Sequence, residues 1–309
     1  MKNIARTVQS VPLALIMAAV SSSSFAAVPT IGNFTPIFEG IDYATGSLGN
    51  FGINAMKIDL TDPNIKFYTS PTSATAPNEV IPQTTGDFLS KNGLQVAINA
   101  NFFNYSPINP SAPTTLNGIA VSNGNVVNGS SGGNTQTVVI TQSNVVSIVN
   151  YPLNTLPSSS DYNDVSGFQV LLNGALDTSN FSATSTQACA RTAAGISQNS
   201  STFYLMTIDG LPSCSGGATP EELVQALSHV GAYNAVNLDG GGSTTMVQDG
   251  SNGLPLLLNT PSGGSQRAVG NSLGVYALSL STSVPEPATY LGGLVALGFG
   301  FLLRNKIKN

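Results

Sequence analysis

Short apolar runs bounded by Gly, Asn, Asp and Pro dominate the pattern of hydrophobic and polar positions along the chain. Runs of this kind, rich in β-branched and aromatic residues, predict strands. The alternating run 51–60 ends in a Thr-Asp-Pro-Asn turn, and we expect 65–69 to return beside it as a hairpin. Turns at 122–124 and 142–144 predict two more hairpins. Further strands are expected at 95–99, 168–172, 192–196, 203–208, 235–238, 245–247 and 272–278.

Helical signals are confined to two segments. The stronger begins with Thr-Pro-Glu-Glu at 219–222, which combines an N-cap, a proline at the first helical position and acids in the first turn. Apolar residues then share one face as far as Val230, and Gly231 predicts a left-handed stop. A weaker helix is expected at 81–91. Together these patterns predict an α+β fold, a β-rich and mostly antiparallel sheet system with a few flanking helices.

The first 26 residues have the layout of a secretory signal peptide. A basic start precedes an apolar run at 11–20, and the Ser-Phe-Ala sequence at 24–26 places small residues at the −3 and −1 positions of a cleavage site. The apolar run is far shorter than the ~20 residues that a membrane span needs. The alternative is a buried N-terminal helix. We expect the protein to be exported and the mature domain to cover residues 27–283.

Residues 284–309 form a second, separate signal. A Val-Pro-Glu-Pro motif at 284–287 precedes fourteen mostly apolar residues at 290–303, and a basic tail closes the chain. This segment is short for a stable span, so it predicts a transient membrane contact. It resembles the PEP-CTERM sorting signal of Gram-negative bacteria, which implies processing by an exosortase-type enzyme and a periplasmic, cell-surface or matrix location. A plain tail anchor is the alternative.

Charge is sparse between these two ends. The stretch 27–283 holds five Lys and Arg and fourteen Asp and Glu, so its net charge is −9 with His neutral. A negative domain with five scattered bases has no footprint for nucleic acid, and it lacks a polybasic patch for membranes. We therefore expect no nucleic-acid partner.

Cysteine and histidine are equally scarce. Cys189 and Cys214 are the only cysteines, and in an exported chain such a pair predicts a disulfide. The single histidine, His229, is expected to be solvated at a helix C-terminus. One histidine removes most zinc sites and the Ser-His-Asp triad from contention. No metal-ligand spacing of known type is present, so no cofactor is expected, although a requirement for a divalent metal stays open.

The most informative segment follows the predicted strand at 235–238. It reads Asp-Gly-Gly-Gly-Ser-Thr-Thr from Asp239, and a strand resumes at Met246. Glycines cost about 0.5–1 kcal/mol each relative to alanine in such elements, so three together indicate a left-handed backbone or the close approach of a ligand. Successive amides can form an anion-binding nest, and Asp239 is placed for proton transfer or for orienting a sugar hydroxyl. The alternative is a flexible hairpin turn.

Two arginines stand out because the mature domain holds no others. Arg191 and Arg267 each lie at the entry to a predicted strand. The planar guanidinium suits bidentate binding of phosphate or carboxylate. The alternative is that each pairs with a structural aspartate. The long polar loops 104–115 and 129–135 are candidate rims of a cleft.

At these residues the chain resembles the phosphodiester glycosidase domain family, which includes the lysosomal uncovering enzyme that removes N-acetylglucosamine from a sugar–phosphate–sugar diester. The shared motifs lie between about residues 56 and 277, and the Asn-Leu-Asp-Gly-Gly-Gly-Ser-Thr-Thr-Met block at 237–246 is the most specific. The resemblance implies catalytic roles for Asp239, Asp209 and Arg191. It implies substrate-binding roles for Asn99, Thr192, Gly240, Gly241, Ser243, Thr244, Arg267 and Asn271. Two positions depart from the family pattern: Ala100-Asn101 replaces Gly-Gly, and Leu211 replaces an arginine.

The expected activity is hydrolysis of the bond between a sugar and a phosphodiester in a phosphate-linked glycan, during exopolysaccharide or envelope processing. Asp239 would activate water or stabilise positive charge at the sugar carbon, and Asp209 is the second carboxylate candidate. Retention or inversion depends on the separation of the two carboxylates. One alternative is a non-catalytic matrix protein that binds anionic polysaccharide, and another is a transglycosylase acting in exopolysaccharide assembly.

Overall fold

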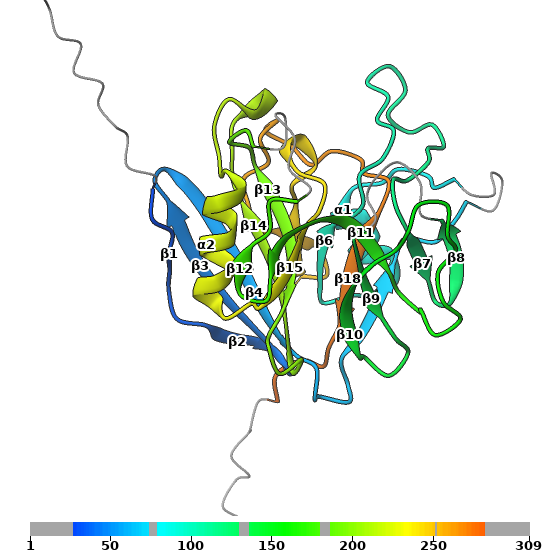
Figure 1. Cartoon of the computed structure of the whole chain (residues 1–309), viewed down its shortest axis with the longest axis horizontal. Helices are drawn as coiled ribbons and strands as arrows, with labels where there is room; N and C mark the ends of the chain where they lie inside the picture. Colours follow the sequence, from blue (N-terminus) through cyan, green and yellow to red (C-terminus); the bar gives the residue numbers. More distant parts are fainter. Residues whose placement is uncertain (1–26, 74–78, 130–135, 180–185, 251, 282–309) are drawn as a thin grey trace, which may run out of the picture.

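The computed structural model describes residues 27–73, 79–129, 136–179, 186–250 and 252–281 (Figure 1). The strands within these ranges pair with one another in antiparallel fashion. The large sheet runs in the order β1 (Thr30–Ile31), β3 (Ile41–Leu48), β4 (Phe51–Asp59), β14 (Thr202–Ile208), β13 (Arg191–Ile196), β15 (Asn234–Asn237), β11 (Val165–Leu172), β9 (Gln136–Ile140) and β10 (Val146–Asn150). Beside this path, β2 (Thr35–Phe38) pairs with β3 and β12 (Ala175–Leu176) pairs with β11. The small sheet runs β17 (Pro255–Leu257), β16 (Met246–Asp249), β6 (Val96–Asn99), β18 (Ser272–Tyr276) and β5 (Lys66–Thr69), and β7 (Ala120–Ser122) pairs with β8 (Asn125–Asn128).

The two larger sheets pack face to face, with a helix on each outer face. In β4, Met56 and Ile58 join the core between the sheets, whereas Ile53 and Ala55 face the helix α2 (Pro220–Val230). This alternation follows from the two-residue period of a strand. On the far face of the small sheet, Ala97 packs with residues of α1 (Thr85–Asn92). The predicted β-rich α+β fold is confirmed.

Both helices have the ends that their sequences predict. Thr219 and Glu222 form a capping box at the start of α2, with each side chain bound to the other residue's amide. Gly231 ends α2 at φ 100°, and His229 is exposed near that end, as expected. The other helix, α1, begins four residues later than predicted because Thr84 caps it through the amide of Asp87.

Local hairpins were predicted more accurately than long-range pairing. The hairpins β7–β8 and β9–β10 form as expected. The hairpin expected between 51–60 and 65–69 is wrong, because β4 pairs with β3 and β14 in the large sheet while β5 pairs with β18 in the small one. The strands between residues 30 and 48 were not anticipated, because their Gly, Ser, Thr and Asp residues lack a clear apolar period.

Six strand ends meet at one edge of the two sheets. The ends of β6, β14 and β15 lie beside the starts of β13, β16 and β18, as their registers require. The connections that follow β6, β14 and β15 gather at the top of Figure 1, and they include the short helical turns η1 (Pro212–Cys214) and η2 (Gly241–Ser243). Loops at such an edge lie on a rigid scaffold, which is a common arrangement of binding sites.

Both predicted targeting segments lie outside the described residues, so the signal peptide and the sorting signal remain predictions. Among the residues that the structure describes, no helix has the length and apolar character needed to cross a membrane.

Candidate active site

The segment that follows β15 crosses from one sheet to the other. It leaves the large sheet at Asn237, turns through η2 and enters the small sheet at Met246. The alternative reading as a hairpin turn is therefore wrong, because β15 and β16 do not pair. The glycines permit this crossing. A Cβ on Gly240 would lie 2.7 Å from the Ala190 carbonyl oxygen, and Gly241 has φ 57°.

Three of the amides expected in the anion-binding nest bind within the protein instead. Gly241 donates its amide to the Ala190 carbonyl at 2.8 Å, and Ser243 and Thr244 donate theirs to carbonyls within the turn. These donors are already used by the protein. The turn therefore serves to shape the backbone beside Asp239.

Asp239 lies at the entrance to this turn, and its backbone is fixed from both sides. Its amide donates to the Ala100 carbonyl at 2.9 Å, and its carbonyl accepts from the side chain of Asn99 at 2.6 Å. Burial raises the pKa of the Asp239 carboxyl to about 6, against the opposing influence of the Ser243 hydroxyl, the Arg267 charge and the Gly240 amide. A carboxyl with a pKa near neutrality suits proton transfer, and Asp239 is partly exposed as a residue.

Arg267 is held beside Asp239 by three contacts. Its guanidinium lies 4.4 Å from the ring centroid of Tyr105, which is a cation–π contact. Its Nη1 atom donates to the hydroxyl of Ser243 at 3.4 Å, and the same hydroxyl hydrogen-bonds to Asp239. The guanidinium also rests on Gly242, where an added Cβ would overlap it. Arg267 remains partly exposed, so it can contact a ligand.

A cleft of about 570 Å³ opens next to Arg267. Its walls come from the loops after β6 and β14 and from the segment before β18. Among the described residues that line it, Arg267 is the only charged one; they are Thr84, Tyr105, Pro110, Pro212, Ser213, Gly242, Ser262, Gly263, Ser265, Gln266, Arg267 and Ala268. Such a lining suits an anionic ligand with neutral polar groups. The loop 104–115 forms part of the rim as expected, whereas most of 129–135 lies outside the described residues.

Several residues expected to bind substrate are buried in the scaffold instead. Asn99, Thr192, Thr244 and Asn271 are fully buried. Asn99 accepts hydrogen bonds from the Thr192 hydroxyl at 2.7 Å and the Thr245 amide at 3.0 Å. Asn271 accepts from the Ser70 amide and donates to Asn101. Their contacts support a positioning role, and direct substrate binding by them stays a prediction. Ser243 is equally buried and acts through Arg267 and Asp239.

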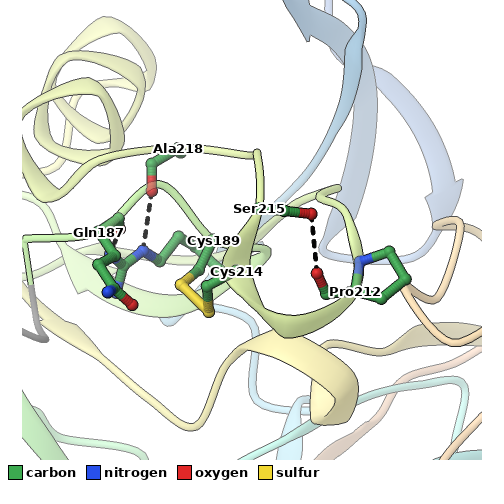
Figure 2. The surroundings of a disulfide bond; sticks show 7 residues. Gln187, Cys189, Pro212, Cys214, Ser215 and Ala218 are labelled. Atoms are coloured by element: carbon green, nitrogen blue, oxygen red, sulfur yellow. Dashed lines mark hydrogen bonds between the residues drawn. A yellow bond between two sulfur atoms is a disulfide. The ribbon is translucent and has the colours of Figure 1, made fainter.

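Arg191 lies beside the disulfide, between Thr192 and Ala190, whose carbonyl accepts the Gly241 amide. Cys189 and Cys214 form the expected bond, with Gln187 and Ala218 next to it (Figure 2). The buried guanidinium of Arg191 donates to the backbone carbonyls of Gln187 and Ala218. Burial lowers the pKa of Arg191 to about 10, so the side chain keeps its charge at neutral pH. These contacts favour a structural role for Arg191 and do not support the expected phosphate binding.

Asp209 follows β14 and is half-buried. Its Oδ1 atom accepts the Thr260 amide at 3.0 Å, and the side chains of Thr260 and Asn259 also donate to it. Burial raises the pKa of the Asp209 carboxyl, although these hydrogen bonds oppose the shift. Asp209 and Asp239 have no hydrogen-bond partner in common. The two candidate carboxylates therefore have separate surroundings.

The contacts of two residues at the site were not anticipated from the sequence. Tyr105 supports Arg267, and the signal available was its position as the one aromatic residue in a predicted rim loop. Asn101, which replaces a family glycine, donates to the carbonyls of Asn117 and Ile119 and accepts from Asn271. The other departure, Leu211, is exposed.

Within the described residues no group of three or more His, Cys, Asp or Glu could hold a metal ion.

Several solved structures resemble the fold of this chain. A structure from Synechocystis has 18% identity and a TM-score of 0.55, and the alignment covers 77% of this chain but only 62% of that one. The catalytic domain of zebrafish N-acetylglucosamine-1-phosphodiester alpha-N-acetylglucosaminidase, auto-inhibited by its pro-peptide, has 20% identity and a TM-score of 0.55, with 82% of this chain and 85% of that one covered. A Burkholderia pseudomallei protein has 14% identity and a TM-score of 0.52, with 75% and 74% covered.

At these identities the structural likeness concerns the fold. No curated protein sequence matches the chain. The sequence profile of the phosphodiester glycosidase family, in contrast, matches residues 92–276, which include β6, the crossing segment and Arg267. The chain therefore belongs to the phosphodiester glycosidase family.

Proposed function

We propose that this protein is a hydrolase that cleaves the glycosyl–phosphodiester bond of a sugar-1-phosphate-linked glycan. The observation that carries the proposal is the electrostatic interaction of Asp239 with Arg267, which is the one charged residue among the described residues that line the cleft. An anionic substrate would bind with its phosphate against Arg267. Asp239 would then face the reacting sugar.

In the proposed reaction, water attacks the anomeric carbon while the bond from that carbon to the phosphodiester oxygen breaks. The products are the free sugar and a phosphate monoester. Asp239, in its ionised form, accepts the proton of the attacking water or stabilises positive charge at the carbon. Arg267 stabilises negative charge on the departing phosphate oxygen, and Tyr105 and Gly242 hold the guanidinium in place.

Replacement of Asp239 by asparagine tests this function. The variant keeps the size of the side chain and loses its negative charge, so sugar release from a sugar-1-phosphodiester should fall by at least about a hundredfold. Circular dichroism and thermal melting should show a folded protein. Undiminished release would refute the assignment. Binding of the substrate by the wild type without release would favour a polysaccharide-binding protein, and transfer of the sugar to an added acceptor would identify a transglycosylase.

We also propose that the protein is exported and acts on envelope or extracellular glycans of a Gram-negative bacterium. The support is the three-part signal-peptide layout of residues 1–26, the three-part sorting-signal layout of residues 284–309, and the Cys189–Cys214 disulfide. Disulfides form and persist in oxidising compartments outside the cytoplasm. Mass spectrometry of the cell-surface protein should find the chain beginning near residue 27 and lacking the basic tail. An intact chain in the cytoplasm would contradict export.

The metal requirement is tested separately. We expect activity to survive dialysis against a chelator, because the proposed chemistry uses only Asp239 and Arg267. Loss of activity on chelation, with recovery on adding a divalent cation, would contradict this expectation.

A further inference from the structure

The segment 260–269 forms one wall of the cleft, and it is anchored at both ends. At its C-terminal end, the side chain of Gln266 accepts the Gly86 amide at 3.0 Å, and Val269 and Gln83 form two backbone hydrogen bonds with each other. At its N-terminal end, the amide of Thr260 donates to the carboxylate of Asp209. Between these anchors, Ser262, Gly263 and Ser265 line the cleft.

Asp209 itself is held in a narrow space between β4 and this segment. Its own amide donates to the Gly52 carbonyl at 2.8 Å, and a Cβ on Gly52 would lie 2.8 Å from the Asp209 Oδ2 atom. Burial and, after it, the negative charge of Asp209 raise the pKa of Tyr43 in the strand β3. The carboxylate is thus occupied on several sides by the protein.

Asn259 shows how far the effect of this anchor extends. It accepts the Met246 amide at 2.8 Å and donates to the Thr244 carbonyl at 3.0 Å. These bonds do not involve Asp209, so residue 259 stays fixed without the carboxylate. Loss of Asp209 would therefore release only the stretch 260–265. Arg267 would stay in place, because its neighbour Gln266 remains bound to the Gly86 amide.

Building on the proposed function, we propose that Asp209 is a positioning residue whose carboxylate fixes the cleft wall at 260–265 and so determines substrate affinity, while Asp239 carries the chemical step. This assignment separates the two carboxylates that the sequence offers as equivalent candidates. It also gives a role in the site to β3 and β4, which lie outside the matched family region.

Three variants test the proposal kinetically. Asp209→Asn keeps one oxygen that can accept the Thr260 amide and loses the other, so kcat should stay close to that of the wild type while KM rises less than in Asp209→Ala. Asp209→Ala removes the acceptor and should raise KM by about tenfold or more with a much smaller change in kcat. Gly52→Ala keeps the carboxylate but displaces it, and should likewise raise KM. The control Tyr43→Phe, which removes a neighbouring hydroxyl without touching the segment, should resemble the wild type.

The pH dependence of kcat/KM gives a second kinetic criterion, because its limb near pH 6 should persist in every one of these variants. Loss of kcat in Asp209→Asn as severe as in Asp239→Asn, with the protein folded, would overturn the proposal.

Hydrogen exchange of the peptide 259–268 decides the structural part without any substrate. Exchange should accelerate most in Asp209→Ala and Gly52→Ala, less in Asp209→Asn, and match the wild type in Tyr43→Phe. Equal protection in all variants would overturn the anchoring role. If the wild type releases no sugar, the proposed function fails, and the exchange measurement still tests the anchor.

Discussion

At the residue scale, the charge of Asp239 depends on opposing influences. Burial favours the protonated carboxyl, whereas Ser243, Arg267 and the Gly240 amide favour the carboxylate, and the pKa lies at about 6. The proposed role requires the carboxylate, so kcat/KM should rise as the pH increases through about 6. A pH–rate profile of the wild type measures this limb. A profile that falls over the same range would make Asp239 the proton donor.

Arg267→Gln extends this prediction. The guanidinium charge lowers the pKa of Asp239, so its removal should move the rising limb to higher pH and also raise KM for an anionic substrate. Lys91→Gln is the matched control, because it removes an equal charge from the exposed surface of α1 and should leave the limb in place. An unshifted limb in Arg267→Gln would show that the two side chains do not interact.

At the scale of elements, the disulfide connects η1 with the start of β13. The two cysteines are 25 residues apart and enclose β13 and β14, so the bond restricts the unfolded chain across two strands of the large sheet. By the loop-entropy estimate, its removal should lower the free energy of unfolding by about 3 kcal/mol. Urea denaturation of the Cys189→Ser, Cys214→Ser double variant measures the loss. A midpoint equal to that of the wild type would contradict this role.

At the scale of the whole molecule, a buried acid pair makes stability depend on pH. Asp164 is fully buried and accepts the Ile140 amide, and burial, together with the charge of nearby Asp161, raises its pKa to about 8. The folded state therefore binds this proton more tightly than the unfolded state does. The contribution to stability is complete below the unfolded pKa near 4 and is lost as the pH rises to about 8.

We predict that the free energy of unfolding declines over this range, by on the order of a few kcal/mol. Asp164→Asn should flatten the decline, because an amide stays neutral and can donate to Asp161. Thermal melting between pH 4 and 9 measures it, with Asp87→Asn on the exposed surface as control. A wild-type curve that rises steadily to pH 8 would contradict the prediction.

The sequence predicted those parts of the molecule in which neighbouring residues decide the outcome. The capping box at Thr219, the stop at Gly231 and the hairpin β7–β8 depend on interactions within a few residues. The partner of β5 was mispredicted because pairing depends on residues more than two hundred positions away. The strand β3 was missed because its pairing with β4, not its own pattern, makes it a strand.

Within the site, the same division holds. The sequence by itself indicated the family, the glycine-rich segment with Asp239, the disulfide and the two arginines of the mature domain, because residue type limits their chemistry. Only the tertiary structure decided that Arg267 and Tyr105 line the cleft, that the carbonyls of Gln187 and Ala218 occupy Arg191, and that Asn99 and Asn271 are buried. Burial and hydrogen-bond partners arise from contacts between distant strand ends, and these contacts separate a side chain that can reach a substrate from one that supports it.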